Sequence, residues 1–129
     1  MPHIIAEYSA NLEDALDVRA LVEDLHQAMI GSGLAPDIAA IRTRAERREH
    51  ARVGDGHAAN GFVHITARLR IGRTPEQRSK LADALLAAAD RQLERAHKTH
   101  PIAMTVEVEE IDNITARKNT LRGKAERAA

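Results

Sequence analysis

The chain has 129 residues, of which 43% are hydrophobic, and this size and composition fit one compact domain over residues 1–129. Its 19 basic and 19 acidic residues cancel, which argues against a general nucleic-acid binder, because such proteins carry a basic surplus and stacking aromatic residues. Without cysteine, the chain can form no disulfide, thiol nucleophile or zinc–thiolate site.

The first residues predict a β-strand over 3–9, where side chains alternate with period two, directly after Met1 and Pro2. A strand start is one of the few positions where a sheet tolerates proline, so Pro2 can simply mark the beginning of the strand. The alternative is that Pro2 is itself the reagent. Pro2 is small enough for Met1 to be removed in the cell, and removal would leave a free secondary amine at the head of a core strand.

Such an amine is a useful general base only if much of it is neutral at the working pH, and the ordinary pKa of an α-amine is about 8. Burial in an apolar cleft and nearby arginine residues both penalise the ammonium form and lower this pKa. Ile4 and Ile5 would provide part of the apolar surroundings, and the chain is rich in arginine.

The next segment predicts an amphipathic helix over about residues 13–30. Its apolar residues recur at helical spacing: Val18, Leu21, Val22, Leu25, Met29 and Ile30. The glycines of the sequence Gly-Ser-Gly at 31–33 end this helix, and Pro36 prevents its resumption.

A second strand is predicted from about Ile38 to Arg44, with Arg42 and Arg44 on the same face. The first β-α-β unit therefore covers about residues 3–44. The charged segment 45–60 follows. We interpret it as a long connector that is long enough to contain a short hairpin.

The pattern then restarts with a strand over 61–69, and a Gly-Arg turn at 72–73 leads to a strong helix start at 74–77. Thr74 is the expected N-cap, Pro75 the first helical residue, and Gln77 completes a capping box. The helix has an apolar stripe for the core, which comprises Leu81, Leu85, Ala89, Leu93 and Ala96, with Leu86 beside it.

The segment His-Pro at 100–101 ends this helix, and alternation over 104–109 predicts the last strand. The second β-α-β unit therefore covers about residues 61–111. The tail 112–129 is polar and basic, and it either covers a neighbouring subunit or is partly disordered.

This order predicts an α+β fold of two layers. Right-handed crossovers place both helices on one face of a four-stranded mixed sheet, and leave the other face for partners. With a single Phe, a single Tyr and no Trp, the core filling is thin, so we expect burial of one sheet face against copies of the same chain. We find neither an N-terminal signal nor a membrane-length apolar run, and we expect a cytoplasmic protein without a membrane partner.

The seven histidines invite a metal interpretation, but a metal site needs three or four converging ligands. His97 and His100 fall at a helix end, and His64 lies on the polar face of its strand. We interpret them as structural or surface residues and expect no metal and no cofactor. The sequence also has no Gly-rich phosphate loop.

The segment 72–78, Gly-Arg-Thr-Pro-Glu-Gln-Arg, followed by Leu81, resembles the tautomerase superfamily. In that superfamily a Gly-Arg-Ser/Thr turn follows a strand and opens the helix of a β-α-β unit. Together with Pro2, the strand Ile-Arg-Thr-Arg at 41–44 and the stretch 55–64, the chain is similar over nearly its whole length to the 5-carboxymethyl-2-hydroxymuconate Δ-isomerases.

This resemblance implies a homotrimer of duplicated β-α-β units that uses no metal or organic cofactor. It implies isomerisation of a dienol polycarboxylate to its conjugated ketone in homoprotocatechuate degradation, with Pro2 as the base and then the acid. Arg42 and Arg73 would bind the carboxylates and the 2-oxo oxygen, because a guanidinium grips a carboxylate bidentately, stays charged and can stabilise a dienolate. Arg44 would be a second clamp or a solvated neighbour.

One departure keeps alternatives open. Members of the branch carry more aromatic residues in the segment that corresponds to 45–61, where this chain has Ala, Arg, Glu and His, so the shape and preference of the pocket are in question. The chain would then be another tautomerase acting on a smaller 2-hydroxydienoate, or a non-catalytic trimeric binding module whose site has decayed.

Overall fold

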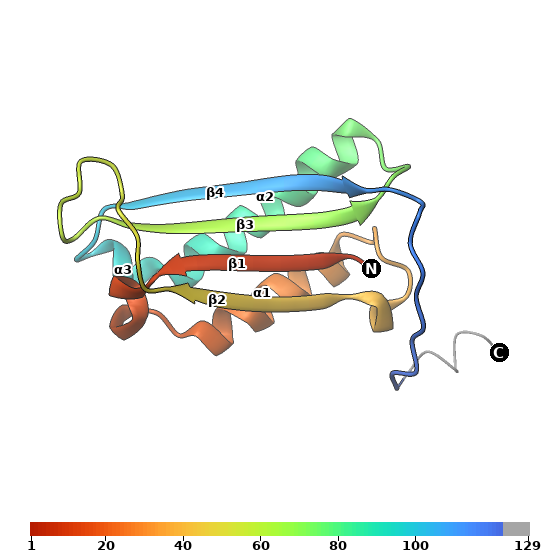
Figure 1. Cartoon of the computed structure of the whole chain (residues 1–129), viewed down its shortest axis with the longest axis horizontal. Helices are drawn as coiled ribbons and strands as arrows, with labels where there is room; N and C mark the ends of the chain where they lie inside the picture. Colours follow the sequence, from red (N-terminus) through yellow and green to blue (C-terminus); the bar gives the residue numbers. More distant parts are fainter. Residues whose placement is uncertain (123–129) are drawn as a thin grey trace.

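The computed structural model describes residues 1–122, and its strands form one mixed sheet in the order β2-β1-β3-β4 (Figure 1). The strands are β1 His3–Ser9, β2 Arg42–Arg48, β3 Gly61–Arg70 and β4 Ile102–Ile111. β1 is parallel to β2, β3 is parallel to β4, and the central pair β1 and β3 is antiparallel. The sheet therefore joins two β-α-β units side by side, which confirms the predicted fold class.

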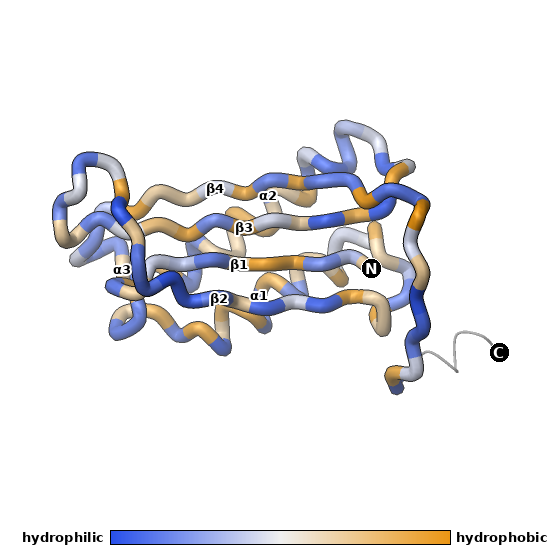
Figure 2. The backbone as a smooth tube through the Cα atoms, viewed as in Figure 1, coloured by the Kyte–Doolittle hydropathy of each residue, from blue (hydrophilic) through white to orange (hydrophobic). Residues whose placement is uncertain are grey.

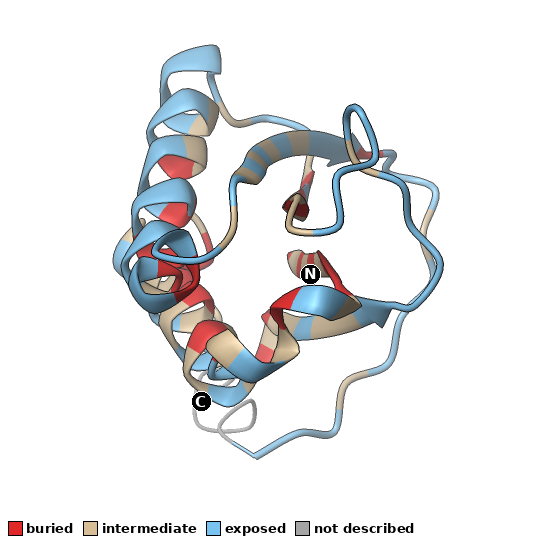
Figure 3. Ribbon diagram, turned by 90° about the vertical axis from the view of Figure 1, so that its left-hand side faces the viewer, coloured by how far each residue is buried: buried red, intermediate tan, exposed pale blue. Residues whose placement is uncertain are grey.

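The two long helices, α1 (Val18–Gly31) and α2 (Pro75–Gln92), lie next to each other on one face of the sheet (Figures 1 and 3). A short helix α3 (Glu94–His97) follows α2, and 3-10 turns occupy Ala10–Ala15 and Ile38–Ala40. The arrangement with both crossover helices on the same face is the one that right-handed connections require.

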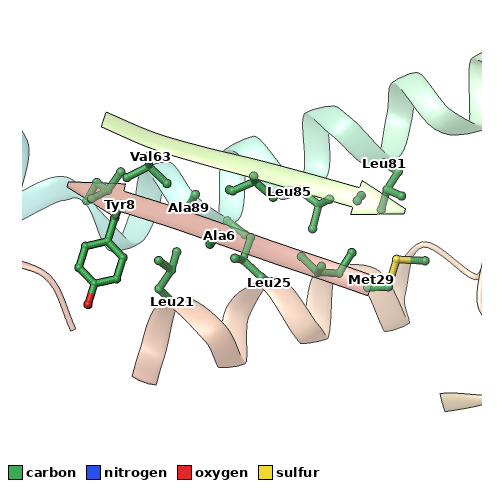
Figure 4. Close-up of a cluster of buried hydrophobic side chains, with 14 of the residues drawn as sticks. Ala6, Tyr8, Leu21, Leu25, Met29, Val63, Leu81, Leu85 and Ala89 are labelled. Atoms are coloured by element: carbon green, nitrogen blue, oxygen red, sulfur yellow. The ribbon is translucent and has the colours of Figure 1, made fainter. Parts of the chain in front are cut away.

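The core fills the space between this sheet face and the two helices (Figure 4). The buried side chains alternate along the strands, with Val63, Ile65, Ala67 and Leu69 on β3 at most 1% exposed. Figure 2 shows the corresponding alternation of hydrophobic and hydrophilic residues along β3. The helices contribute the residues that the sequence predicted, among them Leu25 and Leu85, each fully buried. Each such side chain contributes about 1.5–3 kcal/mol by leaving water.

The predicted start of the second helix is confirmed in detail. The hydroxyl of Thr74 accepts a hydrogen bond from the Gln77 amide at 3.1 Å, and the Gln77 side chain accepts one from the Thr74 amide at 2.9 Å. Pro75 is the first residue of α2. This capping box fixes where α2 leaves the turn at Gly72, whose φ of +118° is a left-handed conformation that glycine adopts without strain.

The bounds of three elements, α1, β2 and α2, differ most from the prediction. α1 begins at Val18 instead of residue 13, because the Asp17 side chain caps it by accepting from the Ala20 amide at 3.0 Å. Residues 38–40 form a 3-10 turn, and β2 continues to Arg48, since each of its residues pairs with β1. The stretch that connects β2 to β3 is therefore 49–60 instead of 45–60. The third difference is at the end of α2, which stops at Gln92 and is followed by α3.

The open face of the sheet is polar and charged. Its side chains pair across the strands, with Arg48 on Glu7, Arg68 on Glu109 and His64 on Glu107. Within residues 1–122, no helix is long and apolar enough to cross a membrane. Across the same residues, no three His, Asp or Glu side chains gather closely enough to hold a metal ion.

The chain after β4 crosses the end of the sheet at which β1 begins (Figure 1). We call residues 112–122 the C-terminal strap. The guanidinium of Arg70 donates to the Thr115 hydroxyl at 2.9 Å, and the Asn119 side chain donates to the Ala39 carbonyl at 2.9 Å. The described part of the tail thus contacts its own chain. The prediction for residues 123–129 lies outside the described residues.

Candidate active site

A cleft of about 370 Å³ opens at this end of the sheet, close to the first residues of β1. Its volume is in the range of small-molecule sites. The cleft draws on four separate parts of the chain, and its lining consists of Met1, Ala35, Pro36, Asp37, Ala40, Arg42, Arg70, Arg73, Arg117 and Asn119.

The pairing of β1 with β2 places the N-terminus in this cleft. Pro2 is almost fully buried, and its carbonyl accepts a hydrogen bond from the Arg42 amide at 3.1 Å. This bond begins the parallel ladder in which His3 pairs with Arg42. The Arg42 side chain consequently lines the cleft together with Met1, the residue attached to the Pro2 nitrogen.

Arg73 reaches the cleft from the turn between β3 and α2. Its guanidinium donates to the Leu34 carbonyl at 2.6 Å and to the Arg70 carbonyl at 3.4 Å. These bonds tie the loop after α1 to the turn before α2, so Arg73 has a structural role. A guanidinium carries five N–H donors, and donors therefore remain with which Arg73 can bind an anion.

The sequence analysis assigned no role to Arg70, Asp37, Arg117 or Asn119, all of which line the cleft. The signal for Arg70 was present, since it continues the alternation of β3 on the open face beyond Arg68. The residues 117–119 resemble the C-terminal Lys/Asn region of the family only weakly, and this match assigned no role to Arg117 or Asn119, because their position depends on the path of the strap across the sheet end.

The charges in the cleft favour an anionic ligand. Among residues 1–122, four guanidinium groups line it, against one carboxylate, that of Asp37. Burial lowers the pKa of the Met1 α-amine below its ordinary value, and the guanidinium groups of Arg42, Arg117 and Arg70 lower it further, opposed by Asp37. Burial and the guanidinium of Arg44 likewise lower the pKa of His3. An amine at this position is therefore neutral to a larger extent than a free one.

Other sequence-predicted residues lie elsewhere. Arg44 shares the strand face of Arg42 but does not line the cleft, and its guanidinium lies 3.1 Å from the Nδ1 atom of His3. His64 is on the open sheet face against Glu107. The segment 45–61, whose composition put the pocket shape in question, lies away from this site. Residues within 48–60 line a separate polar cleft of about 250 Å³ at the opposite end of the sheet, beside Ser9 and Asn11.

Comparison with known proteins places the chain among characterised families. A family model described as 5-carboxymethyl-2-hydroxymuconate isomerase matches residues 2–125. A 5-carboxymethyl-2-hydroxymuconate Delta-isomerase of Escherichia coli is 26% identical over 111 residues, which are 86% of this chain and 87% of that protein.

Solved structures share the fold. The crystal structure of a 5-carboxymethyl-2-hydroxymuconate isomerase from Deinococcus radiodurans R1 superposes with a TM-score of 0.82 at 24% identity, covering 92% of this chain and 90% of that one. A structure described as a fused 4-OT wild type symmetric trimer has a TM-score of 0.64 at 18% identity, with 92% of each chain covered.

Proposed function

We propose a function from one premise: the chain belongs to the 5-carboxymethyl-2-hydroxymuconate isomerase family. It is an isomerase of an unsaturated 2-hydroxy polycarboxylate, of which 5-carboxymethyl-2-hydroxymuconate from homoprotocatechuate degradation is the first candidate, and it works without a cofactor. The observation that carries the proposal is the chain terminus at a cleft lined by four arginine residues. This combination provides a base of lowered pKa and cations for several carboxylates at one place.

In this proposal, removal of Met1 exposes the secondary amine of Pro2, which takes the place of the Met1 amine among the same guanidinium groups. The neutral amine accepts the proton of the substrate's 2-hydroxyl group, and a dienolate forms. The resulting ammonium returns a proton to the far carbon of the diene, which gives the conjugated ketone. One proton leaves and one returns, so Pro2 is the base in the first step and the acid in the second.

The arginine residues bind the substrate and stabilise the dienolate. Arg42 lines the cleft beside the N-terminus, and Arg73 is held in position by its two bonds to backbone carbonyls. Fixed guanidinium groups favour a carboxylate in the ground state and the oxyanion as it develops. Arg44 does not contact the substrate in this scheme, because its guanidinium contacts His3 and does not line the cleft.

We also propose a homotrimer. A relative in fold is described as a symmetric trimer. The polar sheet face opposite the helices is the surface left for contacts between copies of the chain. A solution mass of one chain at assay concentration, measured by light scattering, would contradict the trimer. The cytoplasmic location expected from the sequence stays a prediction.

The direct test is ultraviolet-monitored isomerisation of 5-carboxymethyl-2-hydroxymuconate beside plain 2-hydroxymuconate, with the loss of Met1 verified by intact mass. Faster turnover of the first substrate supports the proposal. The reverse preference retains the chemistry and changes the substrate to a smaller dienoate. No turnover of either by the Met1-free chain would refute the isomerase and favour a binding module.

The roles of the two arginine residues have their own test. Arg42→Ala and Arg73→Ala should each raise the Michaelis constant by about 10-fold or more, since a hydrogen bond to a charged group is worth about 1.5–3 kcal/mol. Arg91→Ala, on the exposed last turn of α2, is the matched control. If either variant changed the Michaelis constant no more than Arg91→Ala does, that arginine would lose its assigned role.

A further inference from the structure

The C-terminal strap, residues 112–122, forms one side of the cleft although it lies outside both β-α-β units. Thr115 and Asn119 attach it to the body of the chain, through Arg70 and through the Ala39 carbonyl. Between these two attachment points lies Arg117, which lines the cleft.

Within the strap, Thr115 and Asn119 are half-buried against the body. Ala116, Arg117, Lys118 and Thr120 are exposed, and of these four Arg117 is the one that lines the cleft. The position of Arg117 is thus determined by its register between two hydrogen-bonded neighbours. Its neighbour Lys118, also a cation, lies outside the cleft.

The guanidinium of Arg117 is available to a ligand. The bonds that hold the strap come from Thr115 and Asn119, and across residues 1–122 no carboxylate forms an ion pair with Arg117. Arg70 and Arg73 differ, because each donates to a protein group, namely the Thr115 hydroxyl and the Leu34 carbonyl. Arg117 is nevertheless close enough to the N-terminus to lower the pKa of the Met1 amine, second only to Arg42 among the charged groups.

The proposed substrate calls for a cation of this kind. A muconate has two carboxylates, and the carboxymethyl substituent adds a third. Arg42 and Arg73 are already assigned to the 2-oxo end and a carboxylate, and Arg70 holds the strap. A guanidinium forms paired, charge-assisted hydrogen bonds with a carboxylate, so a further arginine in the cleft fits the third carboxylate.

We propose that Arg117 is the specificity-determining residue of the cleft. It binds the third carboxylate of a tricarboxylate substrate, which a dicarboxylate substrate lacks. Thr115 and Asn119 act as positioning residues that hold the strap in register. The identity of the substrate in this inference rests on the proposed function. The choice of Arg117 rests on the geometry of the strap.

The test compares both substrates in steady-state kinetics. Arg117→Ala should lower the ratio of kcat/KM for 5-carboxymethyl-2-hydroxymuconate over that for 2-hydroxymuconate by about 10- to 100-fold. Arg117→Lys should restore part of the ratio, because it returns the charge without the bidentate fork. Thr115→Val should shift the ratio in the same direction by a smaller factor. Lys118→Ala is the matched control and should leave the ratio unchanged.

If Arg117→Ala lowered kcat/KM equally for both substrates, or for neither, the role of Arg117 would be overturned, while the proposed isomerase activity would be unaffected. If the wild-type chain turned over neither substrate, the proposed function would fail, and equilibrium binding would then decide the inference. Propane-1,2,3-tricarboxylate and glutarate are the probes for isothermal titration. A preference for the tricarboxylate that Arg117→Ala removes and Lys118→Ala retains supports the inference, and a preference unchanged in Arg117→Ala overturns it.

Discussion

The two β-α-β units have the same topology but different ends. In each, a strand pairs in parallel with the strand that follows its helix, and a backbone hydrogen bond joins the heads of the two strands. In the first unit the Arg42 amide donates to the Pro2 carbonyl at 3.1 Å, and in the second the Gly61 amide donates to the Pro101 carbonyl at 2.9 Å. The backbone framework is therefore repeated.

The surroundings of these strand heads are not repeated. Pro2 follows Met1, and Met1 lines the arginine-lined cleft. Gly61 is buried, and the segment 49–60 continues into it beside a smaller polar cleft. The proposed Pro2 base therefore belongs to the first unit, and the second unit has no counterpart of it. The second unit contributes Arg70 and Arg73 to the same cleft, and so supports the first.

The difference between the two units can be tested at the proline that precedes a strand in each of them, Pro2 in the first unit and Pro101 in the second. Pro2→Ala should lower turnover by about 10²- to 10⁴-fold, the usual effect of losing a positioned general base. Pro101→Ala, at the exposed head of β4, should leave turnover unchanged. Ultraviolet-monitored kinetics measures both, and similar effects of the two substitutions would remove Pro2 from the mechanism.

The repeated framework itself can be tested at the centre of the core. Leu25 on α1 and Leu85 on α2 are both fully buried, and each change to Ala should destabilise the fold by about 2–5 kcal/mol through lost contacts and a residual cavity. Denaturant unfolding at one fixed protein concentration gives the values. Leu86→Ala, at a site 38% exposed, is the control and should have a much smaller effect. A large difference between Leu25→Ala and Leu85→Ala would mean that the units are not equivalent.

The strand head of the second unit has a packing requirement. A Cβ atom at Gly61 would lie 2.7 Å from the Cδ2 atom of Leu12 and 3.1 Å from the Ser9 hydroxyl oxygen. Gly61→Ala should therefore destabilise the fold by about 1–3 kcal/mol through overpacking. Gly31→Ala, where no atom lies within 4 Å, should be tolerated. Equal stability of the two variants in thermal or denaturant unfolding would contradict this account of Gly61.

The helix starts of the two units differ in design. Thr74 belongs to a full capping box, while Asp17 caps α1 with its side chain alone. Thr74→Ala and Asp17→Ala should each cost about 1 kcal/mol of stability. Gln77→Ala should cost less, because Thr74 keeps its own bond to the residue 77 amide. Ser79→Ala, on the exposed side of α2, serves as the control in denaturant unfolding, and a loss there as large as that at Thr74 would argue against a specific cap.

The last prediction concerns the terminal amine of a chain that keeps Met1. Its pKa is lowered from 8.0 in the folded state by burial, Arg42, Arg117 and Arg70. Between the lowered pKa and 8.0 the folded chain binds fewer protons than the unfolded chain, so this group makes stability rise with pH in that window and adds nothing above it. Arg42→Ala should raise the pKa toward 8.0, and Arg91→Ala should not. The pH dependence of amine acylation measures it, and an unchanged pKa in Arg42→Ala would refute the effect of this guanidinium.

Much of the fold followed from the sequence alone because the decisive interactions are local. Alternation placed Val63 and Ile65 on the buried face of β3, and helical spacing placed Leu81 and Leu85 in the core. The capping box at Thr74 is a contact between residues three apart. The position of Pro2 ahead of a core strand was likewise readable, since it depends on chain order and not on packing.

The tertiary structure decided what depends on distant partners. β2 extends to Arg48 because each of its residues pairs with a residue of β1. No alternation of polar and apolar residues within 45–48 predicts this pairing. Arg42 and Arg44 share a strand face in the sequence, yet the cleft ends at Arg42, since only the head of β2 reaches the chain terminus. Arg117 enters the site through hydrogen bonds that join residues 45 and 80 positions apart. Periodicity records which face a residue takes, whereas the assembly of a site depends on register and on how the chain ends pack together.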